Sequence, residues 1–367
     1  MIRLFKSRLL PAGLALLAAC SWVNPHYNPE RAHHRPDGFV NPDASLRQPG
    51  DHPTLTILWR HLRGDFRPER PPEGGYEAFA RAWSVKPDPV QLAQRQQAPV
   101  LTWLGHASLL LQVNGYNLLI DPVFSESVGP TSWLGRRREV PAPLTIDALP
   151  PIDIVLISHS HYDHLDLPSL QALRSQGQRP RILVPLGLKR WLAEEGIDPP
   201  VSEMDWWETW SDAALPGLSI HFVPAQHWSK RTPFDTNRTL WGGFVVETRP
   251  ANQPSPWRFL YTGDTGYSAL FKEIRRRLGA MDYVAVPVGA YQPREFMRPQ
   301  HTDPDDAVQI VLDLEARQAM GLHWGTFPLS REAFDQPPVD LALALKKRGL
   351  PADRLRLFKH GERRALD

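Results

Sequence analysis

The chain has almost no cysteine and almost no net charge, and each shortage excludes a class of protein. Its 367 residues hold one cysteine, so an intramolecular disulfide framework and a cysteine-rich metal site are both excluded. Lysine and arginine number 42 against 40 aspartates and glutamates, with no long basic run. Such a balance gives no electrostatic attraction for nucleic acid, and we expect no nucleic-acid partner.

Long helices are not expected either. The sequence has 38 prolines against 24 glycines, which favours many loops and short elements over a helical bundle or a coiled coil. Apolar residues make up 42% and charged residues 22%, close to ordinary globular usage, so wholesale disorder is excluded. What the chain does contain is 14 histidines, and their spacing is the main indication of function.

The first twenty residues have the pattern of an export signal. Three basic residues precede an apolar run at 9–19, which ends at Cys20 and is too short to span a bilayer. Residues 17–20, Leu-Ala-Ala-Cys, resemble a bacterial lipobox, in which the cysteine is lipidated and becomes the mature N-terminus. An ordinary cleaved signal is the alternative. We therefore expect a lipoprotein of the bacterial cell envelope, attached to the outer membrane through Cys20 and facing the periplasm.

Composition divides the rest of the chain after residue 99. Residues 21–99 are rich in Pro, Arg, Asp and Gln, which predicts a Pro-rich tether and a segment that wraps the main body. In residues 100–367, short apolar runs flanked by Gly, Pro, Asn or Asp predict strands with helices between them, and thus one α/β domain. The predicted strands include 109–111, 118–120, 154–157, 182–184, 244–246, 258–261 and 283–286, and the predicted helices are 168–177, 188–195, 268–278, 304–316 and 339–348.

Histidine and aspartate cluster in the segment 158–166, Ser-His-Ser-His-Tyr-Asp-His-Leu-Asp, directly after a predicted strand. Histidines at i and i+2 would point to opposite sides of a helix, so the segment is predicted to be a loop. Such a loop can direct His159 and His161 toward one ion, and Asp163 and His164 toward another. Imidazole and carboxylate are the ligands that a catalytic zinc prefers.

Three later strand-like runs end in a residue of the same kind. They are followed by His227, Asp264 and His323. Ligands at the ends of several strands are how α/β sheets build a site at one edge. A single histidine is more often a core or surface residue, but together with the segment 158–166 these three indicate a metal centre.

The run His-x-His-x-Asp-His, followed in order by His227, Asp264 and His323, resembles the metallo-β-lactamase superfamily. The short motifs around these residues resemble, more narrowly, the N-acyl-phosphatidylethanolamine phospholipase D branch. These motifs are 102–108 (TWLGHAS), 120–125 (IDPVFS), 158–166 (SHSHYDHLD), 224–228 (PAQHW), 263–267 (GDTGY), 289–291 (GAY) and 323–327 (HWGTF). The resemblance covers roughly residues 100–330 and implies an α/β fold, the αβ/βα four-layer sandwich, with two mixed sheets face to face and helices outside.

The resemblance also implies a cofactor, two Zn2+ ions per chain. It places the first ion on His159, His161 and His227, the second on Asp163, His164 and His323, and Asp264 between them as a bridge. Nothing in this ligand set departs from the family pattern.

Catalytic and substrate-binding residues follow from the same resemblance. Asp163 would hold the proton of the attacking water as well as a zinc ion. His301 matches a family histidine near the substrate phosphate, where it would contact the non-bridging oxygens or protonate the leaving alkoxide. His301 and Tyr291 are the expected substrate-binding residues. The implied reaction is phospholipase D-type hydrolysis of N-acyl-phosphatidylethanolamine-like phospholipids to phosphatidate and N-acylethanolamine.

Other residues near these motifs have a functional and a structural interpretation. Asp121 and His106 are expected to orient metal ligands, since metal-bound histidines need hydrogen-bonded partners. The three arginines at 136–138 either gather an anionic head group or form a solvated run. The three tryptophans within 206–210 either line an acyl groove or membrane interface, or pack in the core.

Competing functions are compatible with parts of the pattern. A metal-dependent lactonase, or another hydrolase of a soluble ester or phosphodiester, would use the same centre, so a substrate panel must separate it. A non-catalytic envelope lipoprotein with a structural metal belongs to another class. The seven-residue set argues against it, because a structural zinc has a closed shell of four ligands. A di-iron oxidoreductase would prefer a carboxylate where His161 stands. The native metal, the acyl chain preference and the oligomeric state stay open.

Overall fold

The computed structural model describes residues 22–43, 45, 56, 59–60, 63–131, 133, 135–198, 200–249 and 255–366. The predicted export signal and Cys20 lie outside these residues. Within the described ranges, no helix combines the length and the apolar composition needed to cross a bilayer.

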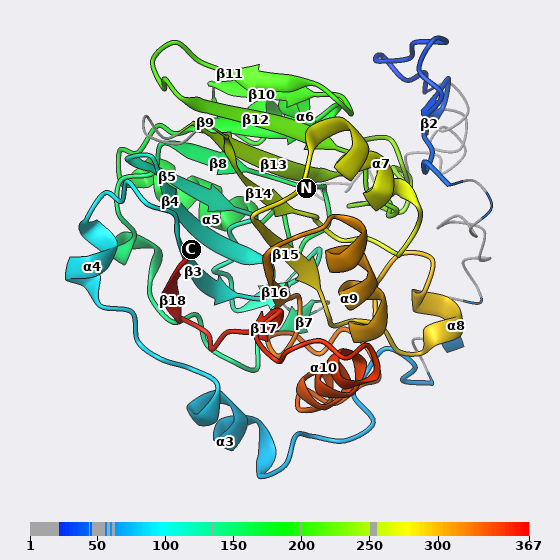
Figure 1. The fold of residues 1–367 in the computed structure, drawn as a ribbon. Helices are drawn as coiled ribbons and strands as arrows, with labels where there is room; N and C mark the ends of the chain where they lie inside the picture. Colours follow the sequence, from blue (N-terminus) through cyan, green and yellow to red (C-terminus); the bar gives the residue numbers. More distant parts are fainter. Residues whose placement is uncertain are drawn as a thin grey trace, which may run out of the picture.

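Two seven-stranded mixed sheets lie face to face (Figure 1). In spatial order, the first sheet contains β10 (Val201–Met204), β9 (Arg181–Pro185), β8 (Ile154–Leu156), β5 (Tyr116–Ile120), β4 (Ser108–Val113), β3 (Val100–Gly105) and β18 (Arg363–Ala365). Strands β10, β9, β8 and β5 are parallel to one another. Strands β5, β4, β3 and β18 pair antiparallel.

The second sheet has the same division into a parallel and an antiparallel half. It contains, in spatial order, β11 (Thr209–Ser211), β12 (Leu218–Val223), β13 (Gly243–Thr248), β14 (Trp257–Tyr261), β15 (Tyr283–Pro287), β16 (Gln318–Leu322) and β17 (Leu355–Leu357). The pairs from β11 to β14 are antiparallel, and those from β14 to β17 are parallel. Two short hairpins, β1 (His34–Arg35) with β2 (Gly38–Phe39) and β6 (Ser127–Val128) with β7 (Arg136–Arg137), lie outside the sheets.

Helices cover the outer faces of both sheets. The first sheet is covered by α5 (Leu167–Ser175) and α6 (Leu188–Glu194), and α4 (Pro89–Ala93) adds one leucine to that layer. The second sheet is covered by α7 (Leu270–Leu278), α9 (Pro304–Asp313) and α10 (Gln336–Lys347). The other described helices are α3 (Gly75–Ala82), α8 (Arg294–Met297) and the 3-10 turn η1 (Ile146–Ala148).

The alternation of side-chain direction along β4 explains its continuous apolar run, Leu109 to Leu111. Leu109 and Leu111 face the core between the sheets, whereas Leu110 faces the outer helices. A strand buried on both faces has no polar side to alternate with. The predicted αβ/βα four-layer sandwich is confirmed by this arrangement.

Helix starts were predicted less well than the helices themselves. The predicted helix 339–348 is wrong at its first residue, since α10 begins at Gln336. Pro337 and Pro338 lie in its first turn, where proline loses no hydrogen bond because the first N–H groups of a helix have no partner. The predicted helix 268–278 likewise begins two residues later, at Leu270.

Described residues of the N-terminal stretch pack against the sandwich. Phe79 of α3 lies in the core beside Trp324, with ring centroids 6.1 Å apart. The Val85 N–H donates to the His360 carbonyl at 2.8 Å. Residues 22–43, with the β1–β2 hairpin, extend along one side of the molecule (Figure 1) and contact it at the points described below.

Candidate metal centre

All seven predicted metal ligands lie at one edge of the sandwich, in loops that follow strands of both sheets. The loop after β8 carries His159, His161, Asp163 and His164, and the loops after β12, β14 and β16 carry His227, Asp264 and His323. The segment 157–164 is a turn and not a helix, as the histidine spacing predicts. The structure therefore brings together residues that span 159–323 of the chain.

Three of these histidines converge on one point. His161 Nδ1 lies 2.9 Å from His159 Nε2 and 3.2 Å from His227 Nε2. Two nitrogens on a tetrahedral zinc with bonds of 2.0–2.1 Å would be about 3.3 Å apart, so the spacing fits a single ion. Burial lowers the pKa of His161 and of His227 to about 3. Both rings are thus neutral at pH 7, the form that binds a metal.

Hydrogen bonds to neighbouring residues determine which ring nitrogen of His227 and of His164 faces the other predicted ligands. The Nδ1 of His227 lies 2.8 Å from the Gln300 carbonyl, and a carbonyl only accepts, so Nδ1 carries the proton. The Nε2 lone pair is then directed to His161. In the same way His164 Nδ1 donates to Asp121 Oδ2 at 2.7 Å, which leaves Nε2 facing Asp264. Such partners fix the orientation of metal-binding histidines.

Asp121 is the hub of these outer contacts. Its carboxylate is fully buried and also accepts from the Ser158 N–H at 2.7 Å and from the Tyr261 hydroxyl at 2.5 Å. The loop 158–166 is thereby fixed to β14 across the two sheets. This is the orienting position that the sequence predicts for Asp121.

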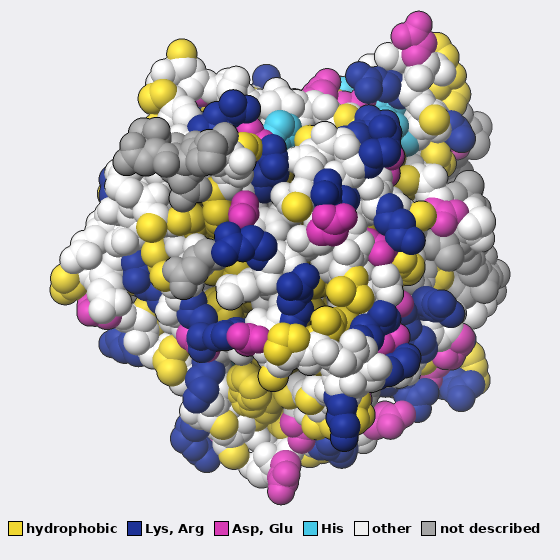
Figure 2. Space-filling view, in the orientation of Figure 1, with side chains coloured by type: hydrophobic (Ala, Val, Ile, Leu, Met, Phe, Trp, Pro, Cys, Tyr) yellow, Lys and Arg dark blue, Asp and Glu magenta, His cyan; other side chains and the backbone are white. Residues whose placement is uncertain are grey.

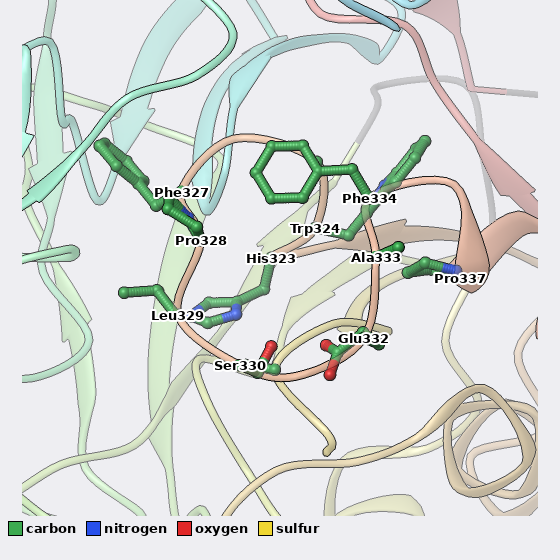
Figure 3. Close-up of a pocket in the computed structure, with 12 residues that line it drawn as sticks. His323, Trp324, Phe327, Pro328, Leu329, Ser330, Glu332, Ala333, Phe334 and Pro337 are labelled. Atoms are coloured by element: carbon green, nitrogen blue, oxygen red, sulfur yellow. The ribbon is translucent and has the colours of Figure 1, made fainter. Parts of the chain in front are cut away.

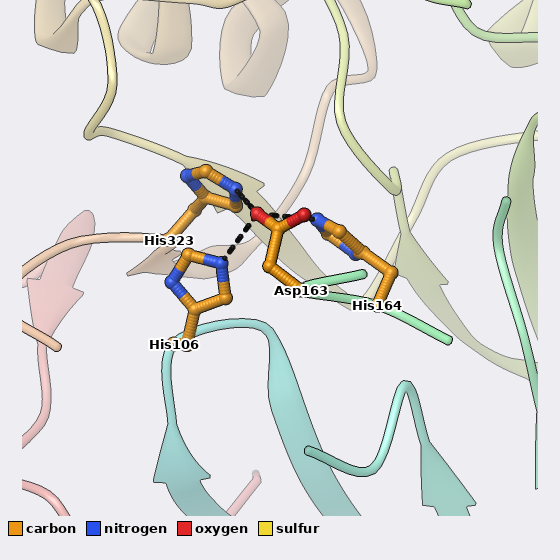
Figure 4. A group of neighbouring side chains, drawn as sticks. All are labelled: His106, Asp163, His164 and His323. Carbon is orange, nitrogen blue, oxygen red and sulfur yellow. Dashed lines mark hydrogen bonds and ion pairs between the residues drawn. The ribbon is translucent and has the colours of Figure 1, made fainter. Parts of the chain in front are cut away.

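The second group contains two carboxylates, of which Asp163 is drawn in Figure 4. The other is Asp264, whose Oδ2 lies 3.1 Å from both His164 Nε2 and His323 Nε2. Asp163 Oδ2 lies 3.3 Å from His323 Nε2 and 3.7 Å from His164 Nε2. Asp264 Oδ2 is also 3.8 Å from His227 Nε2, so this carboxylate lies between the two groups, where a bridging ligand would be.

The electrostatics of the second group favour a cation. Burial alone would lower the pKa of His323, but the carboxylates of Asp264 and Asp163 outweigh it and raise that pKa to about 9. Among the described residues, the buried oxygen Asp264 Oδ1 has no hydrogen-bond partner. Unpaired buried polar atoms are costly, and a bound cation would supply the partner. The donor set of imidazole and carboxylate fits such an ion.

His106 lies beside the second group (Figure 4) and holds two of its members. Its Nε2 is 3.0 Å from Asp163 Oδ2, and its backbone carbonyl accepts from the His323 N–H at 2.9 Å. Burial lowers the pKa of His106 to about 3, so the neutral ring donates one N–H to the carboxylate. The structure thus places His106, like Asp121, in the orienting position that the sequence predicts.

His301 also lies at the centre. It is 8% exposed, and its ring centroid is 5.2 Å from that of His227 and 5.4 Å from that of His323. Its Nδ1 lies 3.9 Å from Asp264 Oδ2. Arg294 fixes the segment by donating to the His301 carbonyl at 2.8 Å. Burial lowers the pKa of His301 to about 3, which makes the ring neutral at pH 7.

Tyr291, by contrast, is not brought to the metal residues by any contact of the described chain. Its hydroxyl donates to Asp340 at 2.5 Å, and its N–H donates to Glu332 at 3.1 Å. It lines a separate polar cavity of about 480 Å³ together with Gln292 and Arg331. A role for Tyr291 in substrate binding stays a prediction.

A small cavity lies beside His323 (Figure 3). The cavity there has a volume of about 20 Å³ and is lined by Trp324, Phe327 and Phe334 among others. That is room for about one water molecule. His161 and Asp163 are the predicted ligands that are partly exposed, so access to the metal residues is from their side.

One member of the arginine cluster and one of the tryptophan cluster, Arg138 and Trp206, are buried and have structural contacts. Arg138 is 5% exposed, donates to the Val123 carbonyl at 2.6 Å and lies 4.6 Å above the Phe327 ring. It supports the loop after β5 and is neither a solvated residue nor an open head-group ligand. Trp206 is buried and stacks on His33 at 4.2 Å, whereas Trp207 is half-buried beneath Arg277.

Several residues that hold the centre carry no sequence signal of that role. Ser158 and Tyr261, which bind Asp121, and Gln300, which fixes His227, are ordinary polar residues in strands and loops. Gln300 and Ser158 each adjoin a predicted site residue, and this adjacency is the one signal that could have indicated them.

Comparison with known proteins agrees with this geometry. Residues 116–324, more than half of the chain, match the Beta-lactamase superfamily domain. The N-acyl-phosphatidylethanolamine-hydrolyzing phospholipase D 1 of Caenorhabditis elegans is 38% identical over 248 residues, which are 65% of this chain and 67% of that protein. The mitochondrial N-acyl-phosphatidylethanolamine-hydrolyzing phospholipase D of Saccharomyces cerevisiae is 38% identical over 261 residues. These are 70% of this chain but 54% of the yeast protein, so the match spans about half of that relative.

A solved structure supports the fold alone. That of a possible metal-dependent hydrolase from Veillonella parvula superposes with a TM-score of 0.58 at 17% identity, and the match covers 73% of this chain and 100% of the other. The chain therefore belongs to the β-lactamase superfamily and, within it, to the branch that resembles the N-acyl-phosphatidylethanolamine-hydrolyzing phospholipases D.

Proposed function

We propose that the protein is a metal-dependent hydrolase with two zinc ions, and that it cleaves N-acyl-phosphatidylethanolamine-like phospholipids to phosphatidate and N-acylethanolamine. The observation that carries the proposal is the position of Asp264 between two convergent ligand groups. The names of the relatives that are 38% identical support the substrate class. A zinc pair supplies an activated water at neutral pH and stabilises charge on a phosphoryl oxygen.

The chain's own residues prepare the site for this reaction. Asp163 is half-buried on the accessible side, and His106 holds its Oδ2 at 3.0 Å. A carboxylate oriented in this way can accept a proton from an attacking water. His301 is neutral, so it is suited to donate one hydrogen bond to a phosphoryl oxygen rather than a full proton to the leaving group.

Purified wild-type protein should contain about two equivalents of zinc per chain, because the seven predicted ligands form two convergent groups joined by Asp264. It should release N-acylethanolamine from N-acyl-phosphatidylethanolamine. Metal analysis by plasma mass spectrometry and a substrate panel check this, with a soluble lactone and bis(p-nitrophenyl) phosphate as the competing substrates. A preference for the lactone, or full activity with one metal per chain, would contradict the proposal.

We also propose that Cys20 is lipidated and anchors the protein to the outer membrane, facing the periplasm. Wild-type protein should then fractionate with membranes and resist a salt wash, since acyl anchoring is hydrophobic and not electrostatic. Cys20→Ser should release it while leaving zinc content unchanged, because the predicted ligands begin at His159. Soluble wild-type protein with an unmodified Cys20, seen by mass spectrometry, would refute the anchor.

A further inference from the structure

An N-terminal segment outside the family-matched region reaches the metal centre. Residues 22–43, here called the arm, precede the matched residues 116–324. At its end the side chain of Asn41 is 4% exposed, and its Oδ1 accepts from the His227 N–H at 2.9 Å. The same oxygen accepts from Trp241 Nε1 at 3.2 Å. One buried amide oxygen of the arm thus holds the backbone of a predicted metal ligand.

A second pair of bonds joins the arm to the residue before His227. The Asp43 N–H donates to Gln226 Oε1 at 3.2 Å, and Gln226 Nε2 donates back to the Asp43 carbonyl at 3.1 Å. Gln226 is fully buried, so these bonds are shielded from competing water. The arm therefore contacts two consecutive residues, through the side chain of Gln226 and the backbone N–H of His227.

The arm itself is fastened to the sandwich at two earlier points. His33 Nε2 lies 2.7 Å from Asp205 Oδ1, and His34 Nε2 lies 3.1 Å from Asp205 Oδ2. All three side chains are buried. Hydrogen bonding accounts for this cluster, because each imidazole can donate one N–H to a separate carboxylate oxygen. The Phe39 N–H then donates to the Asn237 carbonyl at 2.9 Å, close to Asn41.

We propose that Asn41 is a positioning residue for the metal ligand His227, and that the His33–His34–Asp205 cluster keeps it in place. His227 is held at its ring by the Gln300 carbonyl and at its backbone by Asn41. The Gln300 carbonyl sets the orientation of the ring, and Asn41 holds the backbone from which the ring projects toward His161. The inference rests on the proposed function in one respect, that His227 binds the first metal ion.

Asn41→Ala removes the acceptor and should make the first metal ion about 10- to 100-fold easier to remove, the usual effect of losing an outer partner of a metal ligand. The measurement is zinc retained per chain against a graded concentration of a competing chelator. The expected result is early loss of one equivalent, while the second, held by Asp163, His164 and His323, resists as in wild type. The visible spectrum of the cobalt-substituted protein should change in parallel.

Two further variants isolate the role of the carboxamide oxygen. Asn28→Ala makes the same change in the arm at a half-buried residue that has no contact with 226–227 among the described bonds, and should behave as wild type. Asn41→Asp keeps an acceptor oxygen and should restore most of the chelator resistance. Wild-type resistance in Asn41→Ala, or equal loss in Asn28→Ala, would overturn the inference.

Two further variants cover the cases in which Asn41→Ala alone does not decide the question. If Asn41→Ala does not fold, the double variant His33→Ala/His34→Ala loosens the arm without touching residue 41 and should show the same early loss of one equivalent; full retention there would overturn the inference. His227→Ala tests the proposed function separately. If that variant keeps both zinc ions, the ligand assignment itself fails, whereas loss in His227→Ala with retention in Asn41→Ala refutes only the role of the arm.

Discussion

Asp264→Asn should lower turnover by roughly 10³-fold or more and remove most of one zinc equivalent. The reason is the position of the carboxylate, with Oδ2 3.1 Å from His164 and His323 and 3.8 Å from His227. Asparagine has nearly the same shape but no charge, so neither ligand group keeps its shared anion. The three-histidine group around His161 should still hold one ion. Metal analysis and turnover on N-acyl-phosphatidylethanolamine measure both effects.

The control for this variant is an isosteric change far from the centre. Asp198→Asn alters an exposed carboxylate that pairs with Arg174 at the surface, and should leave zinc content and turnover at wild-type values. An Asp264→Asn protein that retains two equivalents and full activity would show that the carboxylate does not bridge. A variant that loses both equivalents would show that the first group depends on it as well.

The candidate metal ligands could be grouped from the sequence because each of them follows a buried strand. Runs such as 154–157 and 319–322 are apolar for a physical reason, burial on both faces, and a polar residue at the end of such a run stands out. Asp163 and His164 share one loop with His159 and His161, so no long-range information is needed to group them. Asp264 and His323 required the additional assumption that strand ends meet at one edge, and this assumption proved correct.

Contacts that depend on distant parts of the chain were not predictable in this way. Asn41 lies 186 residues before His227, and a short polar residue in a Pro-rich segment gives no local sign of burial. Strand β18 is polar in sequence, because at an edge position its pairing with β3 and not its burial determines the structure. Arg138 is likewise buried because backbone carbonyls of the loop after β5 accept its hydrogen bonds, and a run of three arginines predicts the opposite.

His301→Ala should lower kcat by roughly 10²–10³-fold, the usual effect of removing a positioned hydrogen-bond donor to a developing charge, while two zinc equivalents are retained. His301 lies near enough to His227 and Asp264 to be considered a ligand itself, with Nδ1 3.9 Å from Asp264 Oδ2. The complete first group of His159, His161 and His227 argues that it is not needed as one. Loss of zinc in His301→Ala would therefore make His301 a ligand and overturn its placement at the substrate.

The choice between a hydrogen-bond donor and a proton donor at His301 is settled by a second substitution. His301→Gln keeps an N–H group but cannot carry a proton to a leaving oxygen, because an amide does not titrate in this range. Since burial lowers the pKa of His301 to about 3, we expect the neutral donor to be the working form. The glutamine variant should then recover a measurable part of kcat relative to His301→Ala. Equal loss in both variants would instead mean that the imidazole transfers a proton, which requires the bound substrate phosphate to raise its pKa back toward neutrality.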